Sequence, residues 1–162
     1  MASRLSIKSI LDPDNIVFIA PILVIASFFH VFSHNAGTHS FGQIEILAAL
    51  ILVGYYLWDK IAAVYPLEKI WKKRIEAAVC VVVSIFLALV PFAPLMTWQY
   101  YNLYKNSDRY SFNKQILAAI ITAWLGVGVL FYSSYTLLAD RMAAQNASVP
   151  ESSYVAPTQG QQ

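Results

Sequence analysis

KQILAAIITAWLGVGVLFYSSYTLL, residues 114–138, is the stretch that decides the fold of this chain, and Lys114 at its first position is its only charged residue. About 20 consecutive apolar residues in a helix cross the hydrocarbon core of a bilayer. The run is continuous, whereas a strand of a membrane barrel alternates apolar and polar residues. The sequence therefore predicts a transmembrane helix at 114–138.

Three further apolar runs precede this segment, at about 15–33, 43–65 and 74–98. Irregular backbone cannot face lipid, because its N–H and C=O groups would stay unpaired, so each run is expected to be helical. Pro91 and Pro94 interrupt the third run, and proline removes a backbone hydrogen bond from a helix interior. We therefore expect an all-α integral membrane protein with four transmembrane helices, short loops and a proline kink in the third span.

The composition of the whole chain agrees with a lipid environment. Of the 162 residues, 58% are hydrophobic and 12% are charged, whereas soluble domains are roughly a quarter charged. The net charge of +2 is too small to favour nucleic acid as a partner. Cys80 is the single cysteine, which excludes a disulfide framework within the chain.

The two ends of the chain differ from the transmembrane domain, 15–141. Residues 1–14 form an N-terminal segment that could lie as a short helix on the membrane surface or fray, and Asp12 and Pro13 suit the N-cap and first position of the following helix. Residues 142–162 are rich in Gln, Ser, Ala and Pro, a composition that predicts a disordered polar tail.

Basic residues indicate the orientation, because Lys and Arg concentrate in cytoplasmic segments of membrane proteins. With four spans, eight basic residues fall on the side of the two termini and three on the other side. We therefore expect both termini to be cytoplasmic, or on the equivalent side of an organellar membrane. A bacterial inner membrane and an organellar membrane both fit.

The three histidines are the most suggestive chemical feature. His30 and His34 are four residues apart, so both should lie on one face of the first helix, and His39 follows in the next loop. That spacing suits two ligands of one metal ion, or a haem-binding redox subunit. Glu45 could approach from the second span. Polar packing at the membrane edge is the alternative, and no cofactor is required by the sequence.

A basic stretch precedes the third span: Lys69, Lys72, Lys73 and Arg74. These side chains could bind anionic lipid headgroups or an acidic surface of a partner. They could equally serve only to set the topology. Asp59 and Lys60 lie nearby at the end of the second span, where we expect them to compensate each other's charge.

Small residues recur at helical spacing in the last two spans. They are Ala77, Cys80, Ser84 and Ala88 in the third span, and Ala118, Thr122 and Gly126 in the fourth. Small residues let helix backbones approach closely, and close packing drives helix association in lipid. The pattern predicts helix–helix contacts, either within the chain or with another chain.

Motifs of known catalysis are missing: the chain has no phosphate-binding glycine loop, nucleophile elbow or zinc-protease motif. We therefore expect a non-enzymatic subunit of a larger membrane assembly, of the secretion or respiratory type, which acts in assembly or scaffolding. Its partners would be other membrane subunits and lipids. A small homo-oligomeric channel or transporter is one alternative, and a metal- or haem-binding redox subunit that uses His30 and His34 is another.

Overall fold

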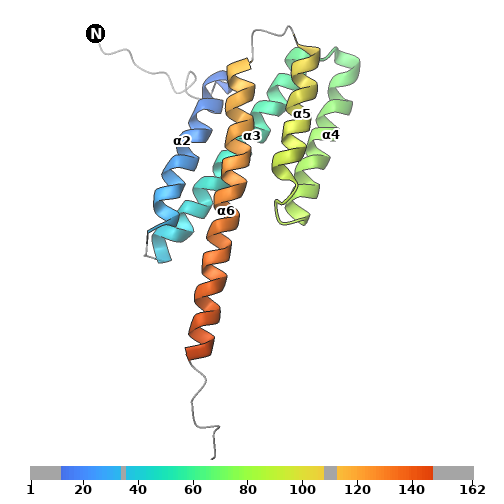
Figure 1. Ribbon diagram of the computed structural model, residues 1–162. Helices are drawn as coiled ribbons and strands as arrows, with labels where there is room; N and C mark the ends of the chain where they lie inside the picture. The colour runs from blue at the N-terminus through green and yellow to red at the C-terminus, as the bar shows by residue number, and fades with distance from the viewer. Residues whose placement is uncertain (1–11, 34–35, 108–112, 148–162) are drawn as a thin grey trace, which may run out of the picture.

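The computed structural model describes residues 12–33, 36–107 and 113–147, and all of the regular structure in these ranges is helical. Its elements are α2 (Pro13–Val31), α3 (Ala36–Val64), α4 (Leu67–Phe86), α5 (Phe92–Asn106) and α6 (Asn113–Ala147). Helices α2, α3 and α6 are long and apolar enough to cross a membrane. Figure 1 shows these three helices side by side, with α4 and α5 forming a separate hairpin against α3 and α6.

Helices α2 and α3 form a closely packed antiparallel pair. Helix α2 begins as expected: the Asp12 carboxylate accepts a hydrogen bond from the Asp14 N–H at 3.1 Å, and Pro13 occupies the first turn. Helix α3 begins at Ala36, so most of the loop expected at 35–42 is helical. Gly42 explains the tight fit, because a Cβ there would lie 3.0 Å from the Ser27 carbonyl oxygen.

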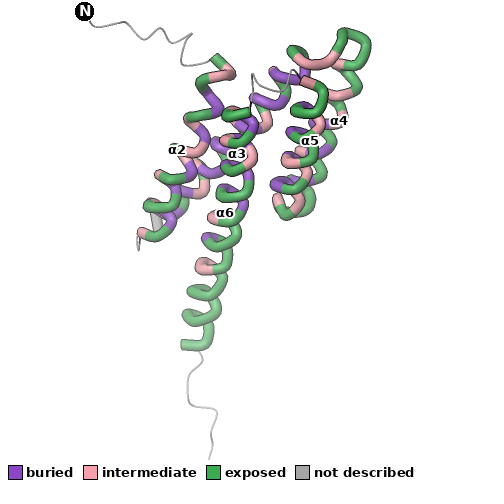
Figure 2. Tube along the Cα trace, turned by 45° about the horizontal axis from the view of Figure 1, so that its top comes forward, coloured by how far each residue is buried: buried purple, intermediate pink, exposed green. Residues whose placement is uncertain are grey.

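Helix α6 packs its small residues into the groove between α2 and α3. Thr122 and Gly126 are buried, and a Cβ on Gly126 would meet Leu50 at 3.1 Å. The helix continues to Ala147, nine residues beyond the expected end of the span at 138. Residues 142–147 of the expected disordered tail are therefore helical. In Figure 2 this last part of α6 extends alone past α2 and α3 and is exposed all round.

The predicted third span, 74–98, is not confirmed, nor is its kink. The structure divides these residues between α4 and α5, which run antiparallel and meet at a turn over 87–91. Gln99 of α5 donates to the Cys80 sulfur of α4 at 3.5 Å, which joins the two arms. The prolines begin a new helix instead of bending an old one, since Pro91 is the N-cap of α5 and Pro94 falls in its first turn, where the helix needs no N–H donor.

Backbone hydrogen bonds close the turn without help from solvent. Leu89 N–H bonds to the Ser84 carbonyl at 2.6 Å and Ala88 N–H to that of Ile85 at 3.2 Å, the pair of bonds that defines a Schellman helix end. Ala88 and Leu89 adopt left-handed φ angles of 53° and 63°. The N–H groups of residues 87–90 and 92 all have carbonyl partners. The N–H donors of the turn are therefore all satisfied within the protein.

The hairpin reaches only to the middle of α3. Its turn residue Leu89 lines the same groove as Leu47 and Leu50, which lie near the midpoint of α3. Helix α5 holds the hairpin in place through buried Met96, Tyr100 and Leu103, and the Tyr100 hydroxyl donates to the Val53 carbonyl at 2.6 Å. The basic stretch lies in the first half of α4, at the end of the hairpin that is far from its turn.

Candidate functional site

Buried polar side chains join α2, α3 and α6 where the turn between α2 and α3 meets the middle of α6. His39 Nδ1 lies 3.1 Å from the Val31 carbonyl oxygen, which can only accept, so Nδ1 carries the proton. His39 Nε2 then accepts from the Ser133 hydroxyl at 2.8 Å. Gln43 donates to Ser133 Oγ at 3.0 Å. The chain of bonds therefore ties three helices together with each partner satisfied.

His30 belongs to a second polar pair beside this network. Its Nδ1 lies 2.7 Å from Glu45 Oε2, a partner that the sequence analysis anticipated. The His30 side chain is half-buried and that of Glu45 is mostly buried. The pair connects α2 to α3 one turn from the close approach at Gly42.

The proposed metal ligands are not brought together by the described part of the structure. Both ring nitrogens of His39 are already engaged with Val31 and Ser133, and His30 bonds to Glu45. His34 lies outside the described residues. Within 12–33, 36–107 and 113–147, no three His, Cys, Asp or Glu side chains are grouped to hold a metal ion.

A buried ammonium lies at the opposite end of α2 and α3. Lys60 Nζ contacts Asp14 Oδ1 at 2.6 Å and Asp59 Oδ2 at 3.4 Å, and the Lys60 side chain is only 9% exposed. Mutual compensation of Asp59 and Lys60 was expected from the sequence. Asp14 was not, because nothing in the sequence pairs the first turn of α2 with the last turns of α3.

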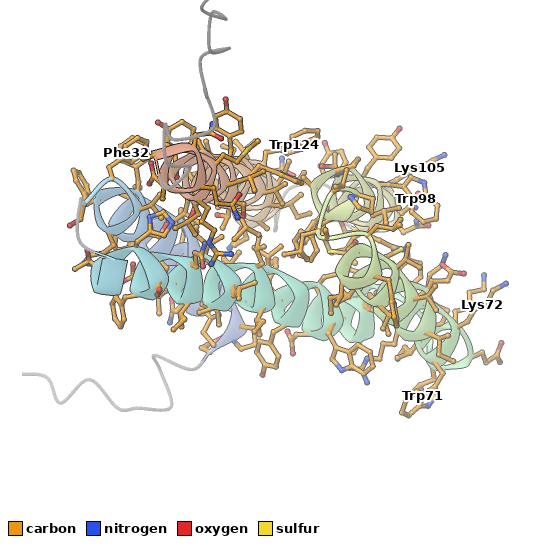
Figure 3. All side chains as sticks on the ribbon, turned by 90° about the horizontal axis from the view of Figure 1, so that it is seen from below. Phe32, Trp71, Lys72, Trp98, Lys105 and Trp124 are labelled. Carbon is orange, nitrogen blue, oxygen red and sulfur yellow. The ribbon has the colours of Figure 1, made fainter. Side chains whose placement is uncertain are left out.

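The basic stretch occupies the first half of α4 and its members have different surroundings. Lys73 donates to Glu76 at 2.6 Å, and this hydrogen bond raises the pKa of the lysine above its usual 10.5. Arg74 lies over the Trp58 ring, with Cζ 4.9 Å from the ring centre. Lys72 points outward from the hairpin (Figure 3). Lys69 and Lys73 line a polar pocket between α4 and α5.

Most of the predicted small-residue stripes pack within the chain. Ala77, Cys80 and Ser84 are buried in the hairpin, and Thr122 and Gly126 are buried against α2 and α3. Ala118 is half-buried, whereas Ala88 lies in the turn and is exposed. The sequence left open whether these residues contact the same chain or another one. At five of the seven positions the residue is buried within the chain itself.

A seam of exposed apolar residues runs along α6 and was not predicted from the sequence; one of its members, Trp124, also donates its Nε1–H to Thr97 Oγ1 of α5 at 3.0 Å. Exposed residues follow one another at spacings of four and three along the whole helix: Leu117, Ile121, Trp124, Gly128, Phe131, Tyr135, Leu138 and Met142. This is the heptad spacing of a helix that packs against another helix along its length. The heptad spacing of apolar residues is present in the sequence. It is hard to recognise there, because most residues between the seam positions are apolar as well.

Comparison with protein-family models, with curated proteins and with solved structures gave no match.

Proposed function

We propose that this protein is a non-enzymatic subunit of a larger membrane assembly, and that the α6 seam binds a helix of a neighbouring subunit. The seam is the observation that carries the proposal. Helix α6 has 35 residues and is about 52 Å long, whereas the hydrocarbon core is about 30 Å thick. The seam itself, from Leu117 to Met142, rises by about 38 Å, so one end of it extends beyond the hydrocarbon core when α6 crosses near the membrane normal.

The protruding end of α6 is where a partner is most needed. Phe32 stacks on Tyr132 and His39 bonds to Ser133, so α2 and α3 end beside these positions. Beyond them Tyr135, Leu138 and Met142 are 70%, 58% and 57% exposed. Lipid tails cannot cover apolar side chains beyond the bilayer surface. A second helix along the seam covers both the part within lipid and the part outside.

A pair of double variants tests the seam. Leu138→Glu with Met142→Glu places two carboxylates on the seam, and Ala143→Glu with Ala147→Glu places two on the opposite side of the helix, in the turn that follows. After extraction in mild detergent, we expect the first pair to dissociate the protein from its companions and the second pair to leave the complex intact. A wild-type chain that migrates as a monomer with no companion contradicts the proposal.

We further propose that α2, α3 and α6 cross the bilayer and that the α4–α5 hairpin enters and leaves from the side of the N-terminus. Ten of the eleven Lys and Arg residues then fall on one side. Two precede α2, five lie from the end of α3 into α4, and three lie from the end of α5 to the start of α6. Arg141 alone falls on the other side. This bias is stronger than the eight against three of a four-span arrangement, and it makes the N-terminal side cytoplasmic.

Labelling of introduced cysteines with a membrane-impermeant maleimide tests this topology in sealed vesicles. Cys80→Ser removes the single native thiol and keeps an acceptor for Gln99. In that background Lys69→Cys and Asn146→Cys should react from opposite sides. Reaction of both from the same side restores the four-span arrangement and both termini in one compartment.

A further inference from the structure

An apolar groove runs between α3 and the outer face of α4. Its volume is about 670 Å³. The walls include Leu47, Ile51 and Gly54 from α3, and Ala78, Val81 and Ile85 from α4. Ile51 and Ile85 are more than half exposed, so the groove is open on the outside of the protein.

The length of the groove matches one leaflet of a bilayer. From Trp58 at one end to Leu47 at the other, α3 rises by about 16 Å. Half of the hydrocarbon core is about 15 Å thick. The other end of the groove lies at the hairpin turn, beside Leu89 and Phe92. The groove therefore extends from the level of Trp58 to the level at which the hairpin turns back.

A cationic side chain, that of Arg74, lies beside the Trp58 end of the groove. The Arg74 guanidinium stacks over Trp58, and its Nε donates to the Trp58 carbonyl at 3.4 Å. Among the residues that the structure describes, these are the contacts of Arg74. The N–H groups of its two terminal nitrogens are therefore available to donate hydrogen bonds to a ligand. Tryptophan is enriched at the headgroup level, and arginine binds phosphate oxygens with two parallel hydrogen bonds. The end of the groove thus has the chemistry of a phosphate site.

We propose that this groove binds one anionic phospholipid, with an acyl chain along the apolar floor and the phosphate on Arg74. A partner helix fits less well, because a helix 16 Å long and 10 Å wide fills roughly 1,300 Å³, about twice the groove volume. The positive charge of Arg74 beside Trp58 favours a headgroup of net negative charge over a zwitterionic one. The site depends on the hairpin entering the membrane, but not on the α6 partner, since it lies on other helices.

Matched variants separate the acyl-chain contact from the phosphate contact. A Cβ on Gly54 meets nothing within 4 Å, so Gly54→Leu enters the groove from an unobstructed Cβ position. Ala139→Leu is its control, because Ala139 is exposed on α6 and lies outside the α6 seam. Ala78→Leu fills the groove from the opposite wall. Arg74→Gln removes the phosphate contact, and Lys72→Gln removes the same charge from a side chain that points away (Figure 3).

The experiment is native mass spectrometry of protein reconstituted with equal amounts of phosphatidylglycerol and phosphatidylcholine. The wild type, Ala139→Leu and Lys72→Gln should each retain one phosphatidylglycerol. Gly54→Leu and Ala78→Leu should lower lipid occupancy about tenfold. Arg74→Gln should keep a lipid but lose its preference for phosphatidylglycerol, a change of about tenfold in the ratio of the two lipids.

Three results would overturn the proposal. One is equal lipid occupancy in the wild type and both groove-filling variants. Another is a headgroup preference that survives Arg74→Gln. The last is release of a protein companion, instead of a lipid, by the groove-filling variants. Loss of companions by the α6 double variant with retained phosphatidylglycerol would separate this site from the proposed subunit contact.

Discussion

Alanine substitution of four helical glycines should give opposite effects on stability, because their surroundings differ. Alanine is favoured over glycine in a helix interior by about 0.5–1 kcal/mol. Gly54 and Gly128 face open space, so each Gly→Ala change should stabilise the protein by about that amount. At Gly42 the new methyl group would lie 2.9 Å from Val31 Cγ2 and 3.0 Å from the Ser27 carbonyl oxygen.

The contact at Gly42 cannot relax cheaply, since the Ser27 oxygen belongs to the backbone of α2. Forcing a methyl group into a packed site costs about 1–3 kcal/mol. We therefore expect Gly42→Ala to destabilise the protein by about 1–2 kcal/mol after the gain in helix propensity is subtracted. Gly126→Ala should be close to neutral, because its tightest neighbour, 3.1 Å away, is the end of the Leu50 side chain.

Unfolding in mixed micelles with increasing SDS, followed by tryptophan fluorescence, measures the series on one scale. The expected order of stability places Gly54→Ala and Gly128→Ala above the wild type, Gly126→Ala beside it and Gly42→Ala below it. If Gly42→Ala stabilised the protein as much as Gly54→Ala, helices α2 and α3 would not cross as closely as the structure shows, and the reasoning would be refuted.

Three other predictions concern the turn, the polar network and the ion pair of α4. Ala88→Gly should stabilise the fold by about 1 kcal/mol because glycine relieves the left-handed φ, and A88V should destabilise it, both read from the same SDS titration. Ser133→Ala should cost about 1–3 kcal/mol by leaving a buried histidine acceptor unpaired, whereas Ser134→Ala, whose hydroxyl is exposed, should stay within about 0.5 kcal/mol; equal losses would contradict the network. Because the folded pKa of Lys73 is raised, the contribution of its bond to Glu76 is fully present below the usual lysine pKa of 10.5 and is lost as the pH rises through the higher folded value. Thermal unfolding at about pH 9 to 12 should show this loss in the wild type but not in Glu76→Gln.

The sequence predicted the helices that can span a membrane better than it predicted the hairpin. Long apolar runs with few charges leave few alternatives to a spanning helix, and α2, α3 and α6 confirm that three of the runs form helices long and apolar enough to span. In the third run, Pro91 and Pro94 are compatible both with a kink and with the start of a new helix. The turn depends on left-handed φ angles at Ala88 and Leu89. Alanine and leucine do not indicate a left-handed conformation, whereas a glycine or asparagine at these positions would have indicated one.

The polar contacts were predictable only where sequence neighbours were involved. Glu45 was a reasonable partner of His30 because it lies near the start of the next helix and could approach the end of α2. Ser133 lies 94 residues from His39, and only the packing of α6 between α2 and α3 brings the two side chains within 2.8 Å. The α6 seam could not be predicted for a different reason. Its residues differ from the other apolar residues of the helix only in being exposed, and exposure is known only from the structure.

The hairpin that stops at the middle of α3 gives the protein unequal cross-sections. Embedded with α2, α3 and α6 across a bilayer, it presents five helices to one leaflet and three to the other. At a diameter of about 10–12 Å per helix, the two extra helices displace roughly 200 Å² more lipid from the leaflet that holds the hairpin. In the proposed topology the molecule is a wedge, which fits most easily where that leaflet lies on the convex side of a curved membrane.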